Sequence, residues 1–334
     1  MLKRRALVCG AAASLAMPTL AARSATVKHA KKKMAEGGYV AFLAGVRREA
    51  LQKGLSASIV DAALALSVQP NEKVLKADRH QPEFTLTWAQ YKDRVITTKK
   101  ITDGQAAVAQ RANLLAQISA QFGVDKGAIA GIWGLESAYG TKMGTYHVVD
   151  SLATLAYDGR RSAFFRAELF KALHILNQGD IAPAAMLGSY AGAMGQPQFM
   201  PSAYERYATS FPEGGRRNIW TNEADVFASI ANYLAKCGWH AGEPWGEPVR
   251  LPDTVTQAQI GRSVVKPVSY WASIGVRPVL GGQFANAGLD AAVIRPDGAG
   301  GESYLVYHNF NVIRRYNPSD FYALGVGLLG SAVV

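Results

Sequence analysis

Residues 131–140 have the sequence GIWGLESAYG, and residues 192–202 have the sequence GAMGQPQFMPS. On a helix, Glu136 follows Ile129, Ile132 and Trp133 by seven, four and three residues, so these side chains point to one face. A carboxyl group among apolar side chains is poorly solvated, which disfavours its charged form and raises its pKa. This pattern is typical of an acid that donates a proton near neutral pH. Structural glutamates show the same spacing, so the helix alone leaves both interpretations open.

The second stretch combines small residues with amide and aromatic groups. Its members are Gly192, Ala193, Gly195, Gln196, Gln198 and Phe199, with Tyr204 just beyond. This composition suits the close approach of a polar ligand, and it equally suits a tight corner between packed helices.

Apolar spacing predicts a mostly helical chain. Paired short helices are expected between residues 39 and 66, and an extended stretch through residues 70–91. Further helices are expected at Gln105–Phe122, after the capping residue Asp125, at Ser162–Gln178 and at Asp225–Cys237. Beyond Gly242, prolines and paired glycines separate short runs at 249–251, 292–294 and 304–307 that read as strands, and a last helix begins at Pro318-Ser319-Asp320.

These elements predict a mainly α (α+β) fold in five parts. The parts are an export signal at residues 1–25, a helical N-terminal region at 26–100, a helical core at 101–245, a small β-containing domain at 246–316, and a C-terminal helix at 317–334 that packs back on the helical body.

The N-terminus has the three parts of an export signal. A basic start at residues 3–5 precedes an apolar stretch at residues 6–17, which is followed by small residues up to Ala25. The apolar stretch is too short to span a bilayer, so we expect an exported protein without a stable transmembrane span. The paired arginines leave Sec and twin-arginine export both open. Cys9 lacks the small residue that precedes a lipoprotein cysteine, so lipidation is not expected.

Removal of this signal lowers the formal net charge from +11 to +7, because the segment holds four basic residues and no acidic one. The mature chain stays basic, which in an exported protein indicates anionic envelope polymers as counterparts. Nucleic acid is not expected, because no recognition motif or concentrated basic face is present. Cys237 is then the one cysteine left, so no internal disulfide can form.

Several enzyme classes lack their motifs in this sequence. No histidine pairs with another at metal-ligand spacing, and no His-Glu-x-x-His, Gly-x-Ser-x-Gly, P-loop or dinucleotide motif occurs. Acid–base chemistry by a carboxylate remains. A glycosidase ordinarily uses two acids, yet the acids that follow Glu136 have the settings of helix caps or surface residues; these are Asp150, Asp158, Glu168 and Asp180. One well-placed acid suits a reaction in which the substrate supplies the second group.

Six segments together resemble the membrane-bound lytic murein transglycosylase B family, of the glycoside hydrolase family 103 type. They are residues 131–140, 150–155, Arg160-Arg161, 189–202, 231–233 and 307–317. The resemblance covers nearly all of the mature chain, and the Gly-Ala-Met-Gly-x-x-Gln-Phe-Met-Pro-Ser segment with an upstream glutamate is highly specific. It implies a lysozyme-like helical core flanked by a helical domain and a smaller β-containing one. It also implies a periplasmic enzyme that acts on peptidoglycan glycan strands.

The resemblance implies a mechanism that needs no second acid. Glu136 would protonate the oxygen between N-acetylmuramic acid (MurNAc) and N-acetylglucosamine (GlcNAc), and would then take a proton from the C6 hydroxyl of the same muramic sugar. That hydroxyl closes onto C1 as a 1,6-anhydro ring, while the acetamido carbonyl steadies the cationic centre. Substrate-binding roles carry over to Ser189, Gln198, Tyr233, Tyr91, Asn309 and Arg161. For the two tyrosines an ordinary place in the core remains the alternative.

The chain departs from the family in the stretch where members can carry an EF-hand-like calcium loop. Residues 210–220 hold one carboxylate, Glu213, and two arginines, so we expect no metal and no cofactor. The missing lipoprotein cysteine favours a soluble periplasmic form. A hydrolytic muramidase and a noncatalytic peptidoglycan-binding envelope scaffold stay open as alternatives, and envelope proteins are candidate partners.

Overall fold

The computed structural model describes residues 36–79, 86–284 and 286–334, so the expected export signal at residues 1–25 lies outside the described residues. None of the helices in these ranges has the length and apolar character needed to cross a membrane. The helices are α1 (Glu36–Gln52), α2 (Ala57–Leu64), α3 (Glu72–Arg79), α4 (Trp88–Val95), α5 (Thr98–Gln110), α6 (Ala112–Phe122), α7 (Lys126–Ser137), α8 (Val148–Asp158), α9 (Ser162–Gln178), α10 (Pro201–Tyr207), α11 (Glu223–Lys236), α12 (Val268–Ser273), α13 (His308–Tyr316) and α14 (Asp320–Val333). The strands are β1 (Tyr146–His147), β2 (Leu187–Gly188), β3 (Gly246–Arg250), β4 (Lys266–Pro267), β5 (Arg277–Pro278), β6 (Asp290–Ile294) and β7 (Ser303–Val306).

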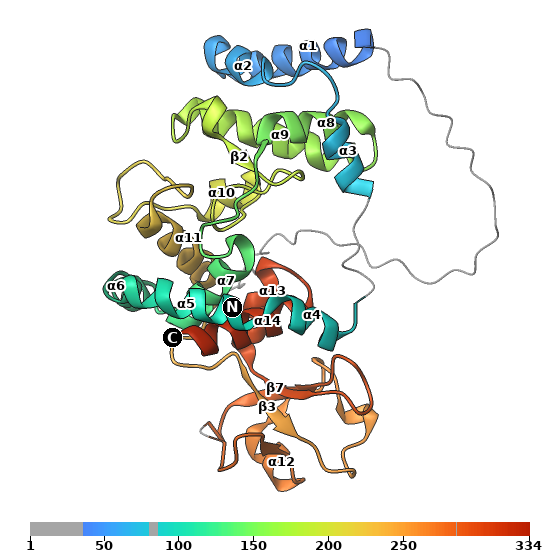
Figure 1. The fold of residues 1–334 in the computed structure, drawn as a ribbon, viewed down its shortest axis with the longest axis vertical. Coiled ribbons are helices and arrows are strands. Elements are labelled where there is room, and N and C mark those ends of the chain that lie inside the picture. Colours follow the sequence, from blue (N-terminus) through green and yellow to red (C-terminus); the bar gives the residue numbers. More distant parts are fainter. Residues whose placement is uncertain (1–35, 80–85, 285) are drawn as a thin grey trace, which may run out of the picture.

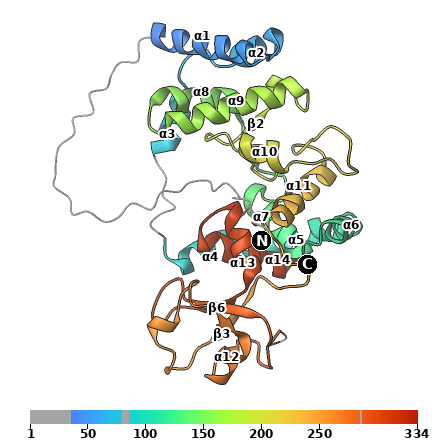
Figure 2. The same cartoon turned by 180° about the vertical axis from the view of Figure 1, so that it is seen from behind.

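The elements are stacked along one long axis (Figure 1), and the same order is visible from behind (Figure 2). At one end, α1 and α2 pack on each other and on α8 and α9, with α3 against α8. The middle holds α7, α11, α13 and α14, and the sheet with α12 forms the opposite end. The expected mainly α (α+β) fold is confirmed.

Two of the expected elements were wrong in detail. The helix expected at Gln105–Phe122 is two helices, α5 and α6, that meet at Arg111 with φ −116° and ψ 15°. The change of direction lets α5 pack on α14 and α6 on α11. The stretch expected to be extended contains α3 and α4, although residues 80–85 between them lie outside the description.

The small sheet joins the helical body through one of its faces. Its strand order is β4-β6-β7-β3-β5, and every neighbouring pair is antiparallel. Successive side chains of a strand point to opposite faces. Tyr304 and Val306 of β7 therefore join the main core, whereas Leu305 joins a second cluster with Val249 and Trp271. The sheet thus belongs to two cores at once.

Glycines allow α7 and α14 to cross at very close range. A Cβ atom built on Gly131 would lie 2.2 Å from the carbonyl oxygen of Val326, and one on Gly330 would lie 2.1 Å from that of Gly127. Only a residue without a side chain fits such a contact. The glycines of the first quoted stretch therefore set the position of the helix that carries Glu136.

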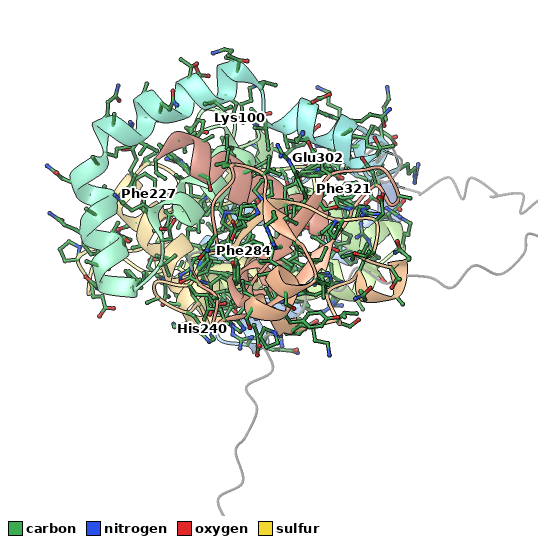
Figure 3. The ribbon with its side chains drawn as sticks, turned by 90° about the horizontal axis from the view of Figure 1, so that it is seen from below. Lys100, Phe227, His240, Phe284, Glu302 and Phe321 are labelled. Carbon is green, nitrogen blue, oxygen red and sulfur yellow. The ribbon has the colours of Figure 1, made fainter. Side chains whose placement is uncertain are left out.

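The loop between β6 and β7 holds the start of α4. Asp297 in this loop accepts hydrogen bonds from the backbone N–H groups of Trp88 and Ala89, the second at 3.0 Å. The indole of Trp88 donates to Glu302 at 2.9 Å and packs against Phe321 of α14, 5.6 Å between ring centroids. Seen from below (Figure 3), Glu302 and Phe321 lie on the same side of the molecule. The sheet, α4 and α14 are thus joined at one place.

Candidate active site

Glu136 lies in the last turn of α7, whose two ends are fixed by local contacts. Asp125 caps the beginning, where its carboxylate accepts the N–H of Gly127 at 2.7 Å, as the sequence predicted. After the end, Ala138 and Tyr139 adopt positive φ angles of 47° and 58°. Such backbone is costly for residues other than glycine and persists only where the surroundings hold it. The glutamate is therefore held between a capped start and a strained end.

The Glu136 side chain is half-buried and faces a cavity of about 250 Å³. The lining residues come from α4, α5, α7 and the chain around the start of α14; they are Tyr91, Arg94, Val95, Lys100, Leu135, Glu136, Asn317 and Tyr322. Glu136 is the only carboxylate among these lining residues. The site therefore offers one acid, with apolar, aromatic and cationic neighbours.

A buried tyrosine holds the carboxylate. The hydroxyl of Tyr322, a residue only 6% exposed, donates to Oε1 of Glu136 at 2.6 Å. Burial, and after it the negative charge of Glu136, raise the pKa of Tyr322 well above its ordinary value of 10.0. The phenol therefore stays protonated and donates to the carboxylate, which favours the charged form of Glu136 and opposes the effect of desolvation.

Further aromatic rings extend this contact behind the cavity. The ring of Tyr316 stacks on that of Tyr322, 6.4 Å between centroids, and lies 4.6 Å from that of Tyr233. Burial, followed by the charge of Glu136, also raises the pKa of Tyr316 well above 10.0. The hydroxyl of Tyr233 donates to the carbonyl oxygen of Arg315. Tyr233 therefore supports the rings next to Glu136 and does not line the cavity itself.

Tyr91 and Glu136 are the two expected site residues that line the same cavity. The ring of Tyr91 packs against Phe321 at 5.8 Å, which brings α4 against the first turn of α14. Arg94, Lys100 and Tyr322 were missed by the sequence reasoning. Arg94 lies three residues after Tyr91, one turn along the same helix face, and that spacing could have found it.

Ser189 and Gln198 use their side chains to shape the 189–199 turn. The Ser189 hydroxyl accepts the N–H groups of Ala191 and Ala193, the second at 3.0 Å. The side-chain amide of Gln198, a residue with φ 51°, donates to the carbonyl oxygens of Gly195 and Met143 at 2.8 and 2.9 Å. Both residues are partly exposed.

Asn309 and Arg161 lie apart from the cavity. Asn309 is fully buried, and its amide bonds the backbone of His240 and Glu243, including a 2.8 Å bond to the His240 carbonyl. Arg161 starts α9, bonds Asp78 at 2.8 Å and lies over the ring of Phe165 at 4.9 Å. The structure does not bring either side chain to the lining of the Glu136 cavity.

Gln196, which the sequence placed only within a polar stretch, connects the two quoted stretches. Its Oε1 accepts the indole N–H of Trp133 at 2.6 Å, and its Nε2 donates to the Trp220 carbonyl at 3.0 Å. Gly140 must be glycine here, because its φ is 82° and a Cβ would lie 2.6 Å from Oε1 of Gln196. The second stretch thus fixes the helix that carries Glu136.

Other acids are committed to structural contacts, and the surface interpretation was wrong for two of them. Asp150 is 8% exposed and accepts hydrogen bonds from Ser67 and Asn71. Glu168 is 3% exposed and accepts the N–H of Ser202, and burial raises its pKa. Among the described residues, no cluster of three or more histidine, cysteine or acidic residues could hold a metal ion.

Comparison with known proteins agrees with this geometry. The family model described as "Transglycosylase SLT domain" matches residues 38–331. The chain belongs to this transglycosylase family. It is 32% identical over 297 residues to membrane-bound lytic murein transglycosylase B of Escherichia coli K12, which covers 86% of this chain and 79% of that relative.

Two solved structures of transglycosylases extend the likeness to three dimensions. SltB3 of Pseudomonas aeruginosa, in complex with NAG-NAM-pentapeptide, is 42% identical, with a TM-score of 0.84 over 88% of this chain and 79% of that one. Slt35 of E. coli, in complex with calcium, is 29% identical, with a TM-score of 0.73 over 87% of this chain and 92% of that one. The lysozyme-like type of helical fold expected from the sequence is confirmed.

Proposed function

We propose that Glu136 is the single acid and base of this enzyme, a lytic transglycosylase that cleaves peptidoglycan between MurNAc and GlcNAc. The observation that carries the proposal is its setting. Glu136 is the only carboxylate that lines its cavity, and a buried, protonated tyrosine donates to it at 2.6 Å. A single acid in a partly apolar site suits a reaction in which the same group first gives and then takes a proton.

In the first step, protonated Glu136 donates its proton to the glycosidic oxygen, and the bond from that oxygen to C1 of MurNAc breaks. The leaving GlcNAc keeps the proton as a hydroxyl hydrogen. The acetamido carbonyl of MurNAc stabilises the positive charge at C1. Glu136 is now a carboxylate, and the Tyr322 hydroxyl supports its negative charge.

In the second step, the carboxylate removes the proton from the C6 hydroxyl of the same sugar, and O6 bonds to C1. The product carries a 1,6-anhydro ring, no water is consumed, and Glu136 is protonated again. The desolvating neighbours and the tyrosine hydrogen bond shift the pKa of a carboxyl in opposite directions, which suits a group that must be both acid and base.

For substrate contacts, we propose Tyr91 at the cavity wall as an aromatic surface for a sugar ring. Ser189, Gln198, Tyr233, Asn309 and Arg161 remain proposals from the resemblance. Arg94 and Lys100 add positive charge to the cavity, which suits the carboxylates of peptide stems. Burial lowers the pKa of Lys100, and the nearby Lys142 lowers it further.

We propose that the protein works in the periplasm on glycan strands. The basic and apolar start of the sequence supports export. Envelope proteins remain candidate partners.

The test is the Glu136→Gln substitution, assayed by the mass of muropeptides released from purified sacculi. We expect the parent to release anhydro-muropeptides, each lighter by one water than a hydrolytic product, and the variant to lose at least about a hundredfold in rate. The parent's melting temperature should be retained, since the amide can still accept from Tyr322. A folded variant that releases fragments at the parent rate would refute the assignment of Glu136. Reducing-end products from the parent would instead identify a muramidase.

A further inference from the structure

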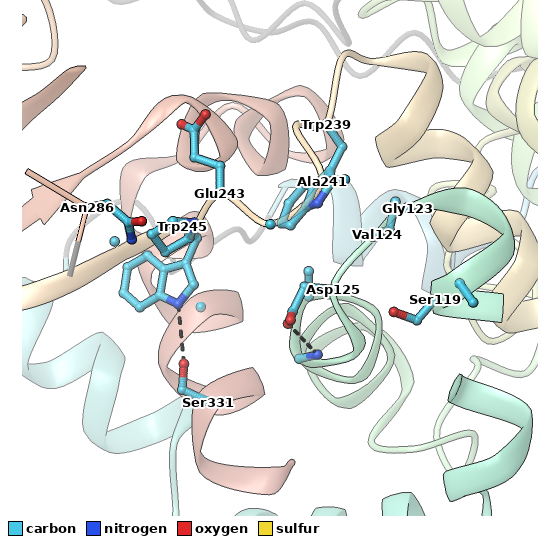
Figure 4. Close-up of a pocket in the computed structure, with 17 residues that line it drawn as sticks. Ser119, Gly123, Val124, Asp125, Trp239, Ala241, Glu243, Trp245, Asn286 and Ser331 are labelled. Atoms are coloured by element: carbon cyan, nitrogen blue, oxygen red, sulfur yellow. Dashed lines mark hydrogen bonds between the residues drawn. The ribbon is translucent and has the colours of Figure 1, made fainter. Parts of the chain in front are cut away.

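A second cavity, of about 610 Å³, lies at the other end of α7 (Figure 4). It is lined by the start of α7, the end of α6, the 239–246 loop and the last turns of α14. Asp125 borders this cavity and Glu136 borders the first one, eleven residues further along the same helix. At the helical rise per residue these two residues lie about 16 Å apart along the helix. None of the sequence motifs points to this second cavity.

Two tryptophans supply its aromatic walls. Figure 4 shows the indoles of Trp239 and Trp245 on neighbouring sides of the cavity, with Asp125 facing them from the start of α7. Trp245 packs directly on Gly327 of α14, where a Cβ would lie 2.3 Å from the indole. This close contact fixes the position of the Trp245 ring on α14. The buried indole N–H of Trp239 has no hydrogen-bond partner among the described residues. Tryptophan combines a broad apolar face with a single polar group, which suits the C–H faces and hydroxyls of a sugar.

Polar side chains line the same cavity as the two tryptophan rings. Asp125 uses Oδ1 for the N–H of Gly127, and Oδ2 has no hydrogen-bond partner within the described residues. The Ser331 hydroxyl accepts the indole N–H of Trp245 at 3.3 Å and keeps its own hydrogen to donate. Ser119 adds another hydroxyl on the α6 side. In contrast, Glu243 points away, since its two oxygens bond the His308 N–H and the His240 ring.

From this arrangement we infer that the cavity is a second sugar-binding site, which takes a sugar residue of a glycan strand other than the segment being cleaved. The sugar ring lies against the indoles, and its hydroxyls donate to Asp125 and accept from the serines. That the sugar comes from a peptidoglycan strand rests on the proposed function. That the cavity binds a sugar rests on the cavity alone. A site at the other end of α7 from the catalytic cavity would hold the enzyme on its insoluble substrate between cleavage events.

The test follows the tryptophan indole N–H resonances of the full chain, labelled with ¹⁵N-tryptophan, during titration with N-acetylchitotetraose. Resonances are assigned by single Trp→Phe substitutions. We expect the Trp239 and Trp245 signals to shift with one common dissociation constant. Asp125→Asn, which keeps an amide oxygen able to cap α7, should weaken that constant at least fivefold. Trp245→Leu, which keeps an apolar side chain against Gly327, should do the same.

Glu136→Gln serves as the matched control, because it changes the other cavity and should leave the Trp239 and Trp245 shifts intact. Unmoved Trp239 and Trp245 signals at millimolar sugar would overturn the inference, as would an unchanged constant in folded Asp125→Asn. These outcomes are independent of the muropeptide assay, so failure of the second site and failure of the proposed catalysis are distinguishable.

Discussion

A hydrogen bond from the Tyr322 hydroxyl to the Glu136 carboxylate joins residues 186 positions apart. A hydrogen bond donated to the charged form of an acid stabilises that form, whereas poor solvation disfavours it. The phenol cannot take over the acid role, because burial and the neighbouring carboxylate raise its own pKa well above 10.0. At the scale of single residues, Tyr322 thus acts directly on the carboxyl that we propose as acid and base.

Tyr322→Phe removes the hydroxyl that donates to Glu136, so the charged form of this carboxyl loses a stabilising hydrogen bond. The measurement is kcat/KM for muropeptide release at the parent's optimum pH. The rate at the optimum should fall roughly tenfold, since the carboxylate formed after the first step is less well supported.

Tyr316→Phe is the matched control, because the Tyr316 hydroxyl donates to the Pro197 carbonyl and not to Glu136. Its kcat/KM should fall less than that of Tyr322→Phe. Equal losses in the two variants would show that a general loss of polarity, rather than the specific hydrogen bond, accounts for the effect.

At the scale of elements, the crossing of α7 and α14 fixes the positions of Glu136 and Tyr322 relative to each other. Gly131→Ala would place a methyl group 2.2 Å from the Val326 carbonyl oxygen, so the helices must separate. We expect a loss of roughly 2–4 kcal/mol in the free energy of unfolding, measured with urea, and lower activity in the fraction that remains folded.

Gly45→Ala provides the control, since Gly45 lies within α1 and a Cβ there meets nothing within 4 Å. Alanine favours a helix over glycine by up to about 1 kcal/mol, so this variant should be as stable as the parent or more so. Equal destabilisation by both substitutions would contradict the close crossing.

Local signals account for the parts of these elements that the sequence could predict. Asp125 caps α7, Gly179 ends α9 with φ 78°, and Ser319 caps α14, each as its residue type indicates. The break at Arg111 could not be predicted in this way. Its guanidinium pairs with Glu223, 112 residues later, and lies over the ring of Trp133 at 5.3 Å.

The same division applies to the site. Spacing within one helix singled out Glu136, and the resemblance added Tyr91, which lines the same cavity. The hydrogen bond from Tyr322 depends on how α14 returns to α7, which no local pattern contains. The position of Asn309 could not be predicted from its neighbours in the sequence either. Its buried side-chain amide forms hydrogen bonds with the backbone of the 240–243 turn.

At the scale of the whole molecule, hydrogen bonds and an ion pair within the protein hold the 210–220 loop in place. The carboxylate of Asp225 accepts the N–H groups of Phe211 and Asn218 at 2.9 and 2.8 Å, and Arg217 pairs with Asp180. Calcium or a chelator should therefore leave the melting temperature unchanged, because a ligand that binds only the native state would raise it. Differential scanning calorimetry at matched ionic strength checks this, with magnesium as the control cation. A rise specific to calcium would contradict it.

The anchoring of α4 by the Asp297 loop has a mechanical consequence. Tyr91 lies one turn beyond the backbone groups that Asp297 bonds, so α4 joins the β-containing end of the molecule to the wall of the Glu136 cavity. A force on the sheet, such as the drag of a tethered polymer, would reach that ring through a single short helix. The β-containing end of the molecule is thus connected through α4 to the wall of the cavity that we propose for the sugar.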